Sequence, residues 1–328
     1  MRKWILPEYI EDILPPEAER IEALRRGLLD HFRSQGFKLV QPPLVEHVDS
    51  LLTGTGHDLD LQTFKVVDPM SGRLLGVRAD ITPQVARIDA HLLNEPGVTR
   101  LCYAGSVLRT TAGIGETREV AQIGAELFGE AGIAGDTEVI LLLLSSLAAV
   151  GAGGALHLDL GHVGVYRALA AGAGIGSDSE DSELFDALRT KDVPAVRALT
   201  TRLAPAWRDA LVALASLYGP AKEVLASARA RLPDTPAIRN ALAALEMLAN
   251  AAAPRVEALH IDLADLRGYH YHSGAIFSVF TPGESAAIGN GGRYDGIGKA
   301  FGRARPATGF TLYLRQLAGI VARSGSGR

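Results

Sequence analysis

Four stretches of the sequence carry charged and hydrogen-bonding residues at spacings that suit a ligand-binding site. They are residues 78–84, residue 109 with 118–126, residues 266–274 and residues 289–296. In the second stretch, Gln122, Gly124 and Glu126 alternate with apolar residues, so a strand would place all three on one face. In the fourth, the glycines at 291 and 292 would let the backbone turn sharply or approach a ligand closely.

Together these residues would suit a zwitterion such as an amino acid. The carboxylates of Asp80 and Glu126 would hold an ammonium group, and the guanidinium groups of Arg109 and Arg267 would pair with a carboxylate. Taken singly, alternating polar residues are more typical of a solvated strand face, and a Gly-Gly pair is more typical of a turn. The presence of all four stretches in one chain favours the binding site.

Hydrophobic spacing predicts the helices and strands that would position these residues. Helices are expected at 15–35, from 82 onward, at 136–150 and at the end of the chain, and strands at 37–40, 74–77, 100–107, 119–127, 155–160, 260–263 and 275–280. The strands at 100–107 and 119–127 would form an antiparallel hairpin around the polar loop 109–118. Residues 289–296 are expected to form a glycine-rich turn.

A change of composition divides the chain. Between Lys191 and His260, 20 of 70 residues are alanine, and prolines interrupt the helical pattern before a coiled-coil heptad can form. We therefore predict an α+β core domain formed by residues 1–160 and 256–328, with an all-helical insertion domain at 161–255. The strands do not show the regular βαβ alternation of a doubly wound fold.

Composition also excludes several classes of protein. The chain has 328 residues, with 33 Lys and Arg against 37 Asp and Glu and a formal net charge of −4, so a phosphate-seeking basic surface over the whole protein is not expected. The single cysteine, Cys102, cannot form an intramolecular disulfide, and the apolar run at 139–150 is too short to cross a bilayer. Because the start carries no secretory signal, these features predict a soluble, cytoplasmic protein.

Two further candidates for chemistry are weaker. His270 and His272, with His260 nearby, would share one face of a strand, but a third metal ligand is not evident and we expect no metal. Cys102 lies in an apolar strand pattern, so we expect a buried, unreactive thiol in preference to a nucleophile.

The motifs, taken in order, resemble those of histidyl-tRNA synthetase and its relatives. The resemblance rests on Pro42-Pro43, residues 78–87, Arg109 with Arg118-Glu119 and residues 122–126, residues 266–277, and residues 291–296. It covers nearly the whole chain, and within the family it is greatest to the synthetase-like regulatory subunits of ATP phosphoribosyltransferase, which serve the first step of histidine biosynthesis. The resemblance implies a class II aminoacyl-tRNA synthetase-like core, with an antiparallel sheet flanked by helices, and a dimer.

Departures from the synthetase pattern favour the regulatory subunit. A synthetase of this family continues into an anticodon-binding domain, whereas this sequence ends at Arg328. Gln316 aligns with the arginine that neutralises ATP phosphate, Tyr313 aligns with a glycine under the nucleotide, and Arg315 is one position away, about 100° around a helix. The loop at 109–112 also lacks the expected acid and Arg-Pro. Because adenylation needs cations at the developing phosphate charge, we expect the catalytic chemistry to be lost.

The amino-acid side of the synthetase pocket is retained, and this retention implies that the chain binds histidine. The matching residues are Asp80, Thr82, Arg109, Gln122, Glu126, Arg267 and Tyr271. We therefore predict a non-catalytic regulatory subunit, without a cofactor or a membrane contact, that partners the short-form catalytic subunit of ATP phosphoribosyltransferase and has histidine as a candidate feedback effector.

The resemblance also implies a homodimer within a hetero-oligomer. Its interface would use the helix at 16–35 and the strand that ends at Pro42-Pro43, with Leu24, Leu28, Phe32 and Phe37 as contact residues. Two alternatives stay open. One is an active histidyl-tRNA synthetase or a related histidine-activating ligase, and the other is an RNA sensor, which the net charge makes a weaker choice.

Overall fold

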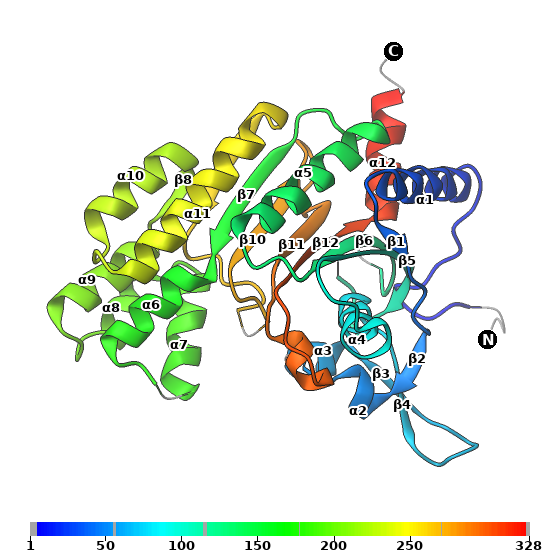
Figure 1. Ribbon diagram of the computed structural model, residues 1–328, viewed down its shortest axis with the longest axis horizontal. Coiled ribbons are helices and arrows are strands. Elements are labelled where there is room, and N and C mark those ends of the chain that lie inside the picture. Colours follow the sequence, from blue (N-terminus) through cyan, green and yellow to red (C-terminus); the bar gives the residue numbers. More distant parts are fainter. Residues whose placement is uncertain (1–4, 55–56, 114–116, 177, 270, 326–328) are drawn as a thin grey trace. The chain divides into compact units, whose positions relative to one another are not determined.

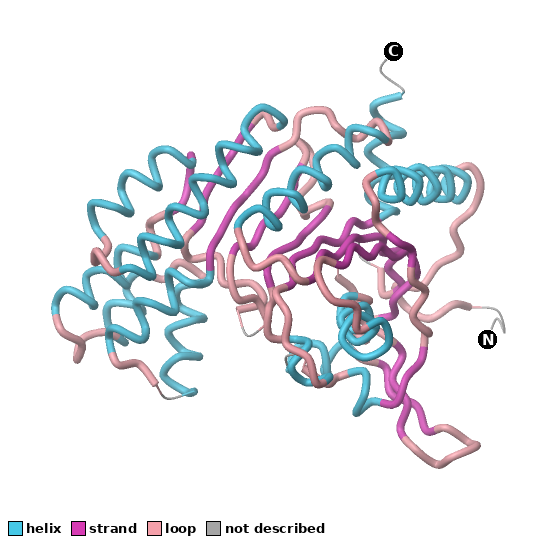
Figure 2. Tube along the Cα trace, in the orientation of Figure 1, coloured by secondary structure: helices cyan, strands magenta, loops and turns pink. Residues whose placement is uncertain are grey.

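The computed structural model describes residues 5–54, 57–113, 117–176, 178–269 and 271–325. The chain divides into two compact units (Figures 1 and 2). The first consists of residues 1–154, 283–290 and 295–328, and the second of residues 155–282 and 291–294. Strand β11 (Gly289–Arg293) contributes residues to both units.

The first unit contains two sheets and the helices that pack on them. Its elements are α1 (Glu17–Ser34), β1 (Lys38–Leu39), β2 (Val45–His47), α2 (Val48–Leu51), α3 (His57–Gln62), β3 (Phe64–Val67), β4 (Leu74–Val77), α4 (Thr82–Arg87), β5 (Thr99–Leu108), β6 (Glu119–Phe128), α5 (Ile133–Ala149), β12 (Ala307–Tyr313) and α12 (Leu314–Gly325). A π-helical turn, Ile88–Leu93, continues α4, and a 3₁₀ turn, Ile297–Phe301, follows β11.

The larger sheet of this unit holds the predicted hairpin at its centre. Strands β1, β5, β6 and β12 lie side by side in that order, with β1 parallel to β5 and the other pairs antiparallel. Gly105 lies opposite Gln122, and Gly309 lies opposite Glu126. The smaller sheet is antiparallel, in the order β2, β4, β3. The predicted antiparallel pairing of residues 100–107 with 119–127 is confirmed.

Helix α1 packs into the core of its own unit, which corrects one prediction. Leu28 and Phe32 have no exposed surface, Leu24 and Phe37 are also buried, and the Phe32 ring meets the Phe310 ring edge-on with centroids 5.8 Å apart. The helix contacts α5 and α12. These four apolar side chains therefore cannot supply a contact surface to a second copy of the chain, because the intramolecular core already covers them.

A buried ion pair joins the π-helical turn to the chain just before β12. Arg305 Nη1 lies 2.9 and 3.1 Å from the two carboxylate oxygens of Asp89, and both side chains are almost fully buried. The same guanidinium donates to the backbone carbonyls of Glu95 and Gly97. Every charge in this group is thus compensated, as burial requires.

The second unit combines a mixed sheet with a set of helices. Its strands lie in the order β10 (Ala275–Phe280), β7 (His157–His162), β9 (Ala258–Asp262) and β8 (Tyr218–Pro220), and only the β7–β9 pair among these is parallel. Its helices are α6 (Val163–Ala173), α7 (Asp178–Arg189), α8 (Val193–Leu199), α9 (Pro205–Leu214), α10 (Ala221–Arg231) and α11 (Pro236–Ala252). The bounds of a separate helical insertion domain, residues 161–255, stay a prediction.

Two local predictions are wrong. Residues 289–293 form strand β11 where a turn was expected, because its glycines admit close neighbours: a Cβ at 289 would lie 2.6 Å from Leu312 Cδ2, and one at 292 would lie 2.7 Å from the Ala275 carbonyl oxygen. The region around His272 forms turns where a strand was considered, and residue 270 lies outside the described residues.

None of the helices in the described ranges is long and apolar enough to cross a membrane.

A partly buried histidine, His162, caps helix α6. The Gly164 N–H donates to His162 Nδ1 at 3.0 Å. Burial, together with the charges of Arg167 and Arg293, lowers the pKa of His162 to about 4 from its ordinary 6.5. Between these two values the unfolded chain binds a proton that the folded chain does not, so stability falls as the pH falls.

We predict that acidification from about pH 7.5 to about pH 5 lowers the free energy of unfolding by about 2 kcal/mol through His162. In His162→Asn the side-chain oxygen can still cap the helix but does not titrate. Urea unfolding at both pH values should therefore show a smaller loss in the variant by about this amount. An equal loss in both proteins would contradict the assignment, since His272, whose pKa is also lowered to about 4, contributes equally to each.

Candidate ligand site

Four of the predicted site residues come together in the first unit. Asp80 and Thr82 lie at the start of α4, and Gln122 and Glu126 lie on β6. Because residues two apart on a strand share a face, Gln122 and Glu126 both point toward the segment before α4, as their contacts show. With Tyr103 on β5 they form what we call the β6 polar cluster: Asp80, Thr82, Tyr103, Gln122 and Glu126.

Gln122 fixes the segment that carries Asp80. Its amide nitrogen donates to Asp80 Oδ2 at 3.1 Å, and its amide oxygen accepts from the Ile81 N–H at 3.3 Å. The other oxygen of Asp80, Oδ1, accepts from the Thr82 N–H at 2.8 Å. Gln122 has no exposed surface, whereas Asp80 is half-buried. Gln122 and the Thr82 N–H therefore hold the carboxylate of Asp80 in place, and part of the surface of Asp80 stays exposed.

Glu126 is buried beneath the other end of the cluster. Its Oε1 accepts hydrogen bonds from Thr82 Oγ1 at 3.0 Å and from the Tyr103 hydroxyl at 3.4 Å. The Tyr103 hydroxyl also lies 2.7 Å from Thr311 Oγ1 on β12. Glu126 is 1% exposed, so it orients Thr82 and Tyr103 and does not form part of the accessible surface.

Arg109 lies at the end of β5 and binds main chain. Its Nε donates to the Ala79 carbonyl at 3.2 Å, directly before Asp80. Its side chain also hydrogen-bonds to the phenol of Tyr313, which accepts a further hydrogen bond from Asn290 Nδ2 at 3.3 Å. Burial raises the pKa of Tyr313, so the phenol stays neutral. The guanidinium is therefore positioned next to the β6 polar cluster.

The residues aligned with the synthetase nucleotide site offer no free cation. Arg315, at the start of α12, forms ion pairs with Glu11 and with Glu17, the latter at 2.8 Å. The neighbouring Gln316 is neutral, and its buried Oε1 has no hydrogen-bond partner among the residues described here. The side chain one position away from the expected arginine is thus already neutralised by two carboxylates.

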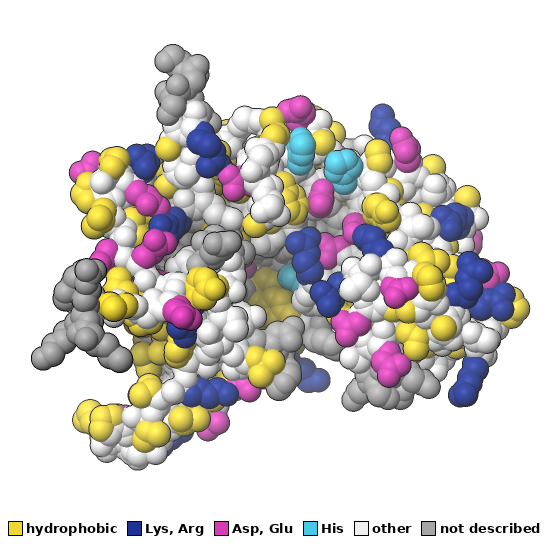
Figure 3. Space-filling view, turned by 180° about the vertical axis from the view of Figure 1, so that it is seen from behind, with side chains coloured by type: hydrophobic (Ala, Val, Ile, Leu, Met, Phe, Trp, Pro, Cys, Tyr) yellow, Lys and Arg dark blue, Asp and Glu magenta, His cyan; other side chains and the backbone are white. Residues whose placement is uncertain are grey.

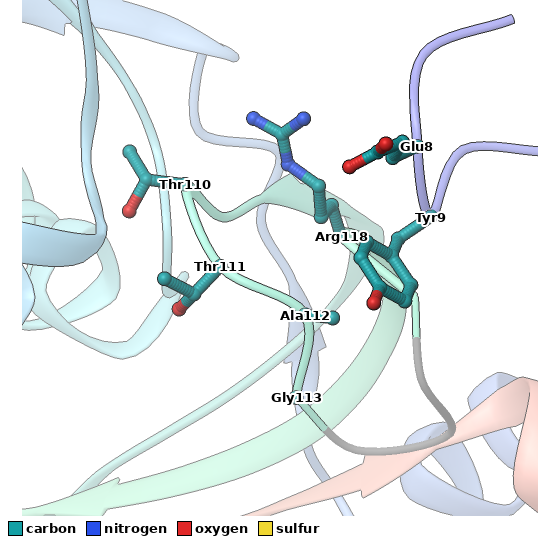
Figure 4. Close-up of a pocket in the computed structure, with 7 residues that line it drawn as sticks. All are labelled: Glu8, Tyr9, Thr110, Thr111, Ala112, Gly113 and Arg118. Carbon is teal, nitrogen blue, oxygen red and sulfur yellow. The ribbon is translucent and has the colours of Figure 1, made fainter.

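A pocket of about 580 Å³ lies along the loop between β5 and β6 (Figure 4). Thr110, Thr111 and Gly113 line one part of it, and Arg118 and Glu8 line another. The Arg118 guanidinium lies over the Phe64 ring, 4.7 Å from its centre. One cation together with one carboxylate gives this pocket little attraction for a polyphosphate.

The remaining predicted residues, Arg267 and Tyr271, belong to the second unit. Arg267 is exposed and forms an ion pair with Asp265, with Nε 2.9 Å from Oδ1. Tyr271 stacks on Tyr294, with ring centres 5.0 Å apart. Their assignment to a histidine site stays a prediction. Within the described ranges, no group of three or more His, Cys, Asp or Glu side chains is placed to hold a metal ion.

Sequence reasoning missed Tyr103, Thr311 and Asp265. Tyr103 and Thr311 are neighbours only because both strands pair with β6, where each lies opposite Gly124. Spacing along one strand carries no such signal. Asp265 does carry a local signal, since it lies two residues before Arg267 and has the opposite charge.

Comparisons with known proteins agree with this architecture. The family model for histidyl-tRNA synthetase matches residues 9–317. The structure of an ATP phosphoribosyltransferase regulatory subunit/histidyl-tRNA synthetase from Bacillus halodurans superposes with a TM-score of 0.85 at 26% identity, over 97% of this chain and 83% of that one. A histidine–tRNA ligase subunit from Alicyclobacillus acidocaldarius shares the fold, with a TM-score of 0.77 at 24% identity, over 98% of each chain. The predicted class II synthetase-like fold is thereby confirmed.

Two relatives in sequence carry the name ATP phosphoribosyltransferase regulatory subunit. The protein from Ralstonia nicotianae is 59% identical over 321 residues, which is 98% of this chain and 82% of the relative. The protein from Thiobacillus denitrificans is 58% identical over 327 residues, which is 99% of this chain and the full length of the relative. The chain therefore belongs to the histidyl-tRNA synthetase-like family of ATP phosphoribosyltransferase regulatory subunits.

Proposed function

We propose that the chain binds a short-form catalytic subunit of ATP phosphoribosyltransferase, is required for its activity in histidine biosynthesis, and transmits feedback by histidine. The observation that carries the proposal is the 58–59% identity, over nearly the whole chain, to relatives named as regulatory subunits. Its site of action would be the cytoplasm, as the composition predicts.

We further propose that the chain is not itself an adenylating enzyme. Adenylation by a synthetase requires cations that stabilise charge developing on phosphate oxygens. Here Arg315 is paired with two carboxylates, Gln316 carries no charge, and the buried Tyr313 fills the position of the aligned glycine. These three features together support the loss of nucleotide chemistry.

The β6 polar cluster is the proposed anchor for histidine. The carboxylate of the half-buried Asp80 would receive the α-ammonium group, and the Thr82 hydroxyl would supply a neighbouring hydrogen bond. Glu126 would act from below by holding Thr82 and Tyr103. Arg109 would contribute positive charge near the ligand carboxylate. The roles of Arg267 and Tyr271 in the same recognition rest on the family resemblance.

The proposed homodimer needs a different apolar surface from the one that the sequence pattern indicated. Exposed apolar side chains gather on the small sheet and its connection: Val66 is 52% exposed, Val67 is 61% exposed and Met70 is 95% exposed. Val45 on β2 and Leu74 on β4 are also exposed. We propose that this sheet, in place of the buried face of α1, contributes to the two-fold contact.

We predict that the purified chain catalyses no histidine-dependent exchange of pyrophosphate with ATP, because Gln316 is uncharged and the neighbouring Arg315 is already paired with two carboxylates. The measurement is incorporation of labelled pyrophosphate into ATP, compared with a reaction without protein. Exchange above that background, abolished by Arg109→Ala, would restore the alternative of an active histidine-activating ligase.

A further prediction is that free histidine binds the chain and that Asp80→Asn weakens this binding by about tenfold or more, which corresponds to about 1.4 kcal/mol or more. Removal of the charge leaves the α-ammonium group without its carboxylate partner. Isothermal titration calorimetry measures both affinities. Glu119→Gln is the matched control, since Glu119 lies at the start of β6 outside the β6 polar cluster, with an exposed side chain and the same charge as Asp80.

Histidine should bind Glu119→Gln and wild type with equal affinity. If Asp80→Asn also bound with the wild-type affinity, the histidine site would lie elsewhere, and the β6 polar cluster would lose its proposed role.

A further inference from the structure

A second pocket lies wholly within the second unit, between helices α8, α9 and α10. Its volume is about 440 Å³, within the range of small-molecule sites. Three arginines, one from each helix, line it: Arg197, Arg208 and Arg231. The pocket is also lined by a carboxylate, a hydroxyl and an apolar side chain, from Asp209, Thr201 and Val212.

The charge of this region is opposite to that of the whole chain. Residues 193–231 contain six Lys and Arg against two Asp and Glu, whereas the full chain has a formal net charge of −4. Figure 3 shows dark blue side chains grouped at the right-hand edge of the molecule, over the helices of the second unit. A local basic surface on an acidic protein concentrates anions.

The cations in the pocket are only partly neutralised. The Arg197 guanidinium has no hydrogen-bond or ion-pair partner within the described ranges. Arg231 Nη1 donates to the Ser216 hydroxyl at 3.2 Å, which leaves its charge uncompensated. Arg208 alone has a carboxylate, Asp209 Oδ1 at 3.0 Å. The lining therefore carries three positive charges and one negative charge.

Helix dipoles account for only part of this arrangement. Arg197 and Arg231 lie in the last turns of α8 and α10, where a cation is favourable. Arg208, however, lies in the first turns of α9, close to the positive end of that helix, where a cation is unfavourable. The three positive charges around this pocket repel each other, and a bound anion would reduce that repulsion.

We propose that this pocket binds a phosphate monoester of a small organic molecule. A net lining charge of +2 matches the charge of a phosphate monoester near neutral pH, which is about −1.5 to −2. Guanidinium groups bind phosphate oxygens through paired hydrogen bonds. The volume exceeds the needs of phosphate alone, and Val212 and Thr201 offer an apolar surface and a hydroxyl to the organic part.

The test is calorimetry on the full chain with ribose 5-phosphate, inorganic phosphate and ribose as probes. We expect ribose 5-phosphate to bind, with a Kd of about 1 mM or lower, and ribose to show no binding. Arg197→Gln and Arg231→Gln should each weaken binding by about tenfold, whereas Arg202→Gln, which removes the same charge from an exposed residue outside the lining, should change it less than about twofold.

Asp209→Asn should change the affinity in the opposite direction. It removes a carboxylate that repels the phosphate, so it should tighten binding by about two- to fivefold. A structural defect would not produce that gain. Absence of binding by both phosphate probes would overturn the proposal, and so would equal weakening by Arg202→Gln and Arg197→Gln. Binding of an RNA duplex without binding of ribose 5-phosphate would also overturn it. These measurements use the chain alone, so their outcome is independent of the proposed function.

Discussion

The buried carboxylate of Glu126 is the constraint on which the first unit depends. It lies 1% exposed in the middle of a sheet, so its oxygen atoms must find hydrogen-bond donors within the protein. Thr82 and Tyr103 supply two of them. The neighbouring strand must also leave room: a Cβ on residue 309 would overlap the Glu126 carboxylate, so only glycine fits there. One buried charge thereby fixes the start of α4 and the strands on both sides of β6.

The residues of the proposed histidine site are tied to the same constraint, whereas the residues aligned with the nucleotide site are not. The residues proposed to bind histidine are held by hydrogen bonds that also hold the fold, since Gln122 binds both Asp80 and the Ile81 main chain. The nucleotide side has no comparable structural role here. Arg315 has become part of the ion-pair network of the N-terminal segment and α1. The proposed function, which includes histidine binding but no adenylation, needs only the first of these two sites.

The β5–β6 hairpin and the grouping of Asp80, Gln122 and Glu126 were predictable, because alternation along a strand and a proline at a helix start are local signals. The strand character of residues 289–293 was not, because their glycines serve close packing that only the folded neighbours reveal. Tyr103 was missed for a similar reason: its contact with Thr311 depends on the register of two strand pairs. The buried face of α1 was assigned to a dimer interface because apolar spacing alone does not tell intramolecular from intermolecular burial.

Reconstitution of activity tests the central claim most directly. A short-form ATP phosphoribosyltransferase chain from the same organism is assayed for phosphoribosyl transfer to ATP, followed by the pyrophosphate that is released. The assay is run with and without an equimolar amount of this protein, and light scattering reports the mass of the mixture. The account predicts low activity of the catalytic chain alone, a large increase when a mixed complex forms, and inhibition of that complex by added histidine. Full activity of the catalytic chain alone, with no change in mass or rate on addition of this protein, would contradict it.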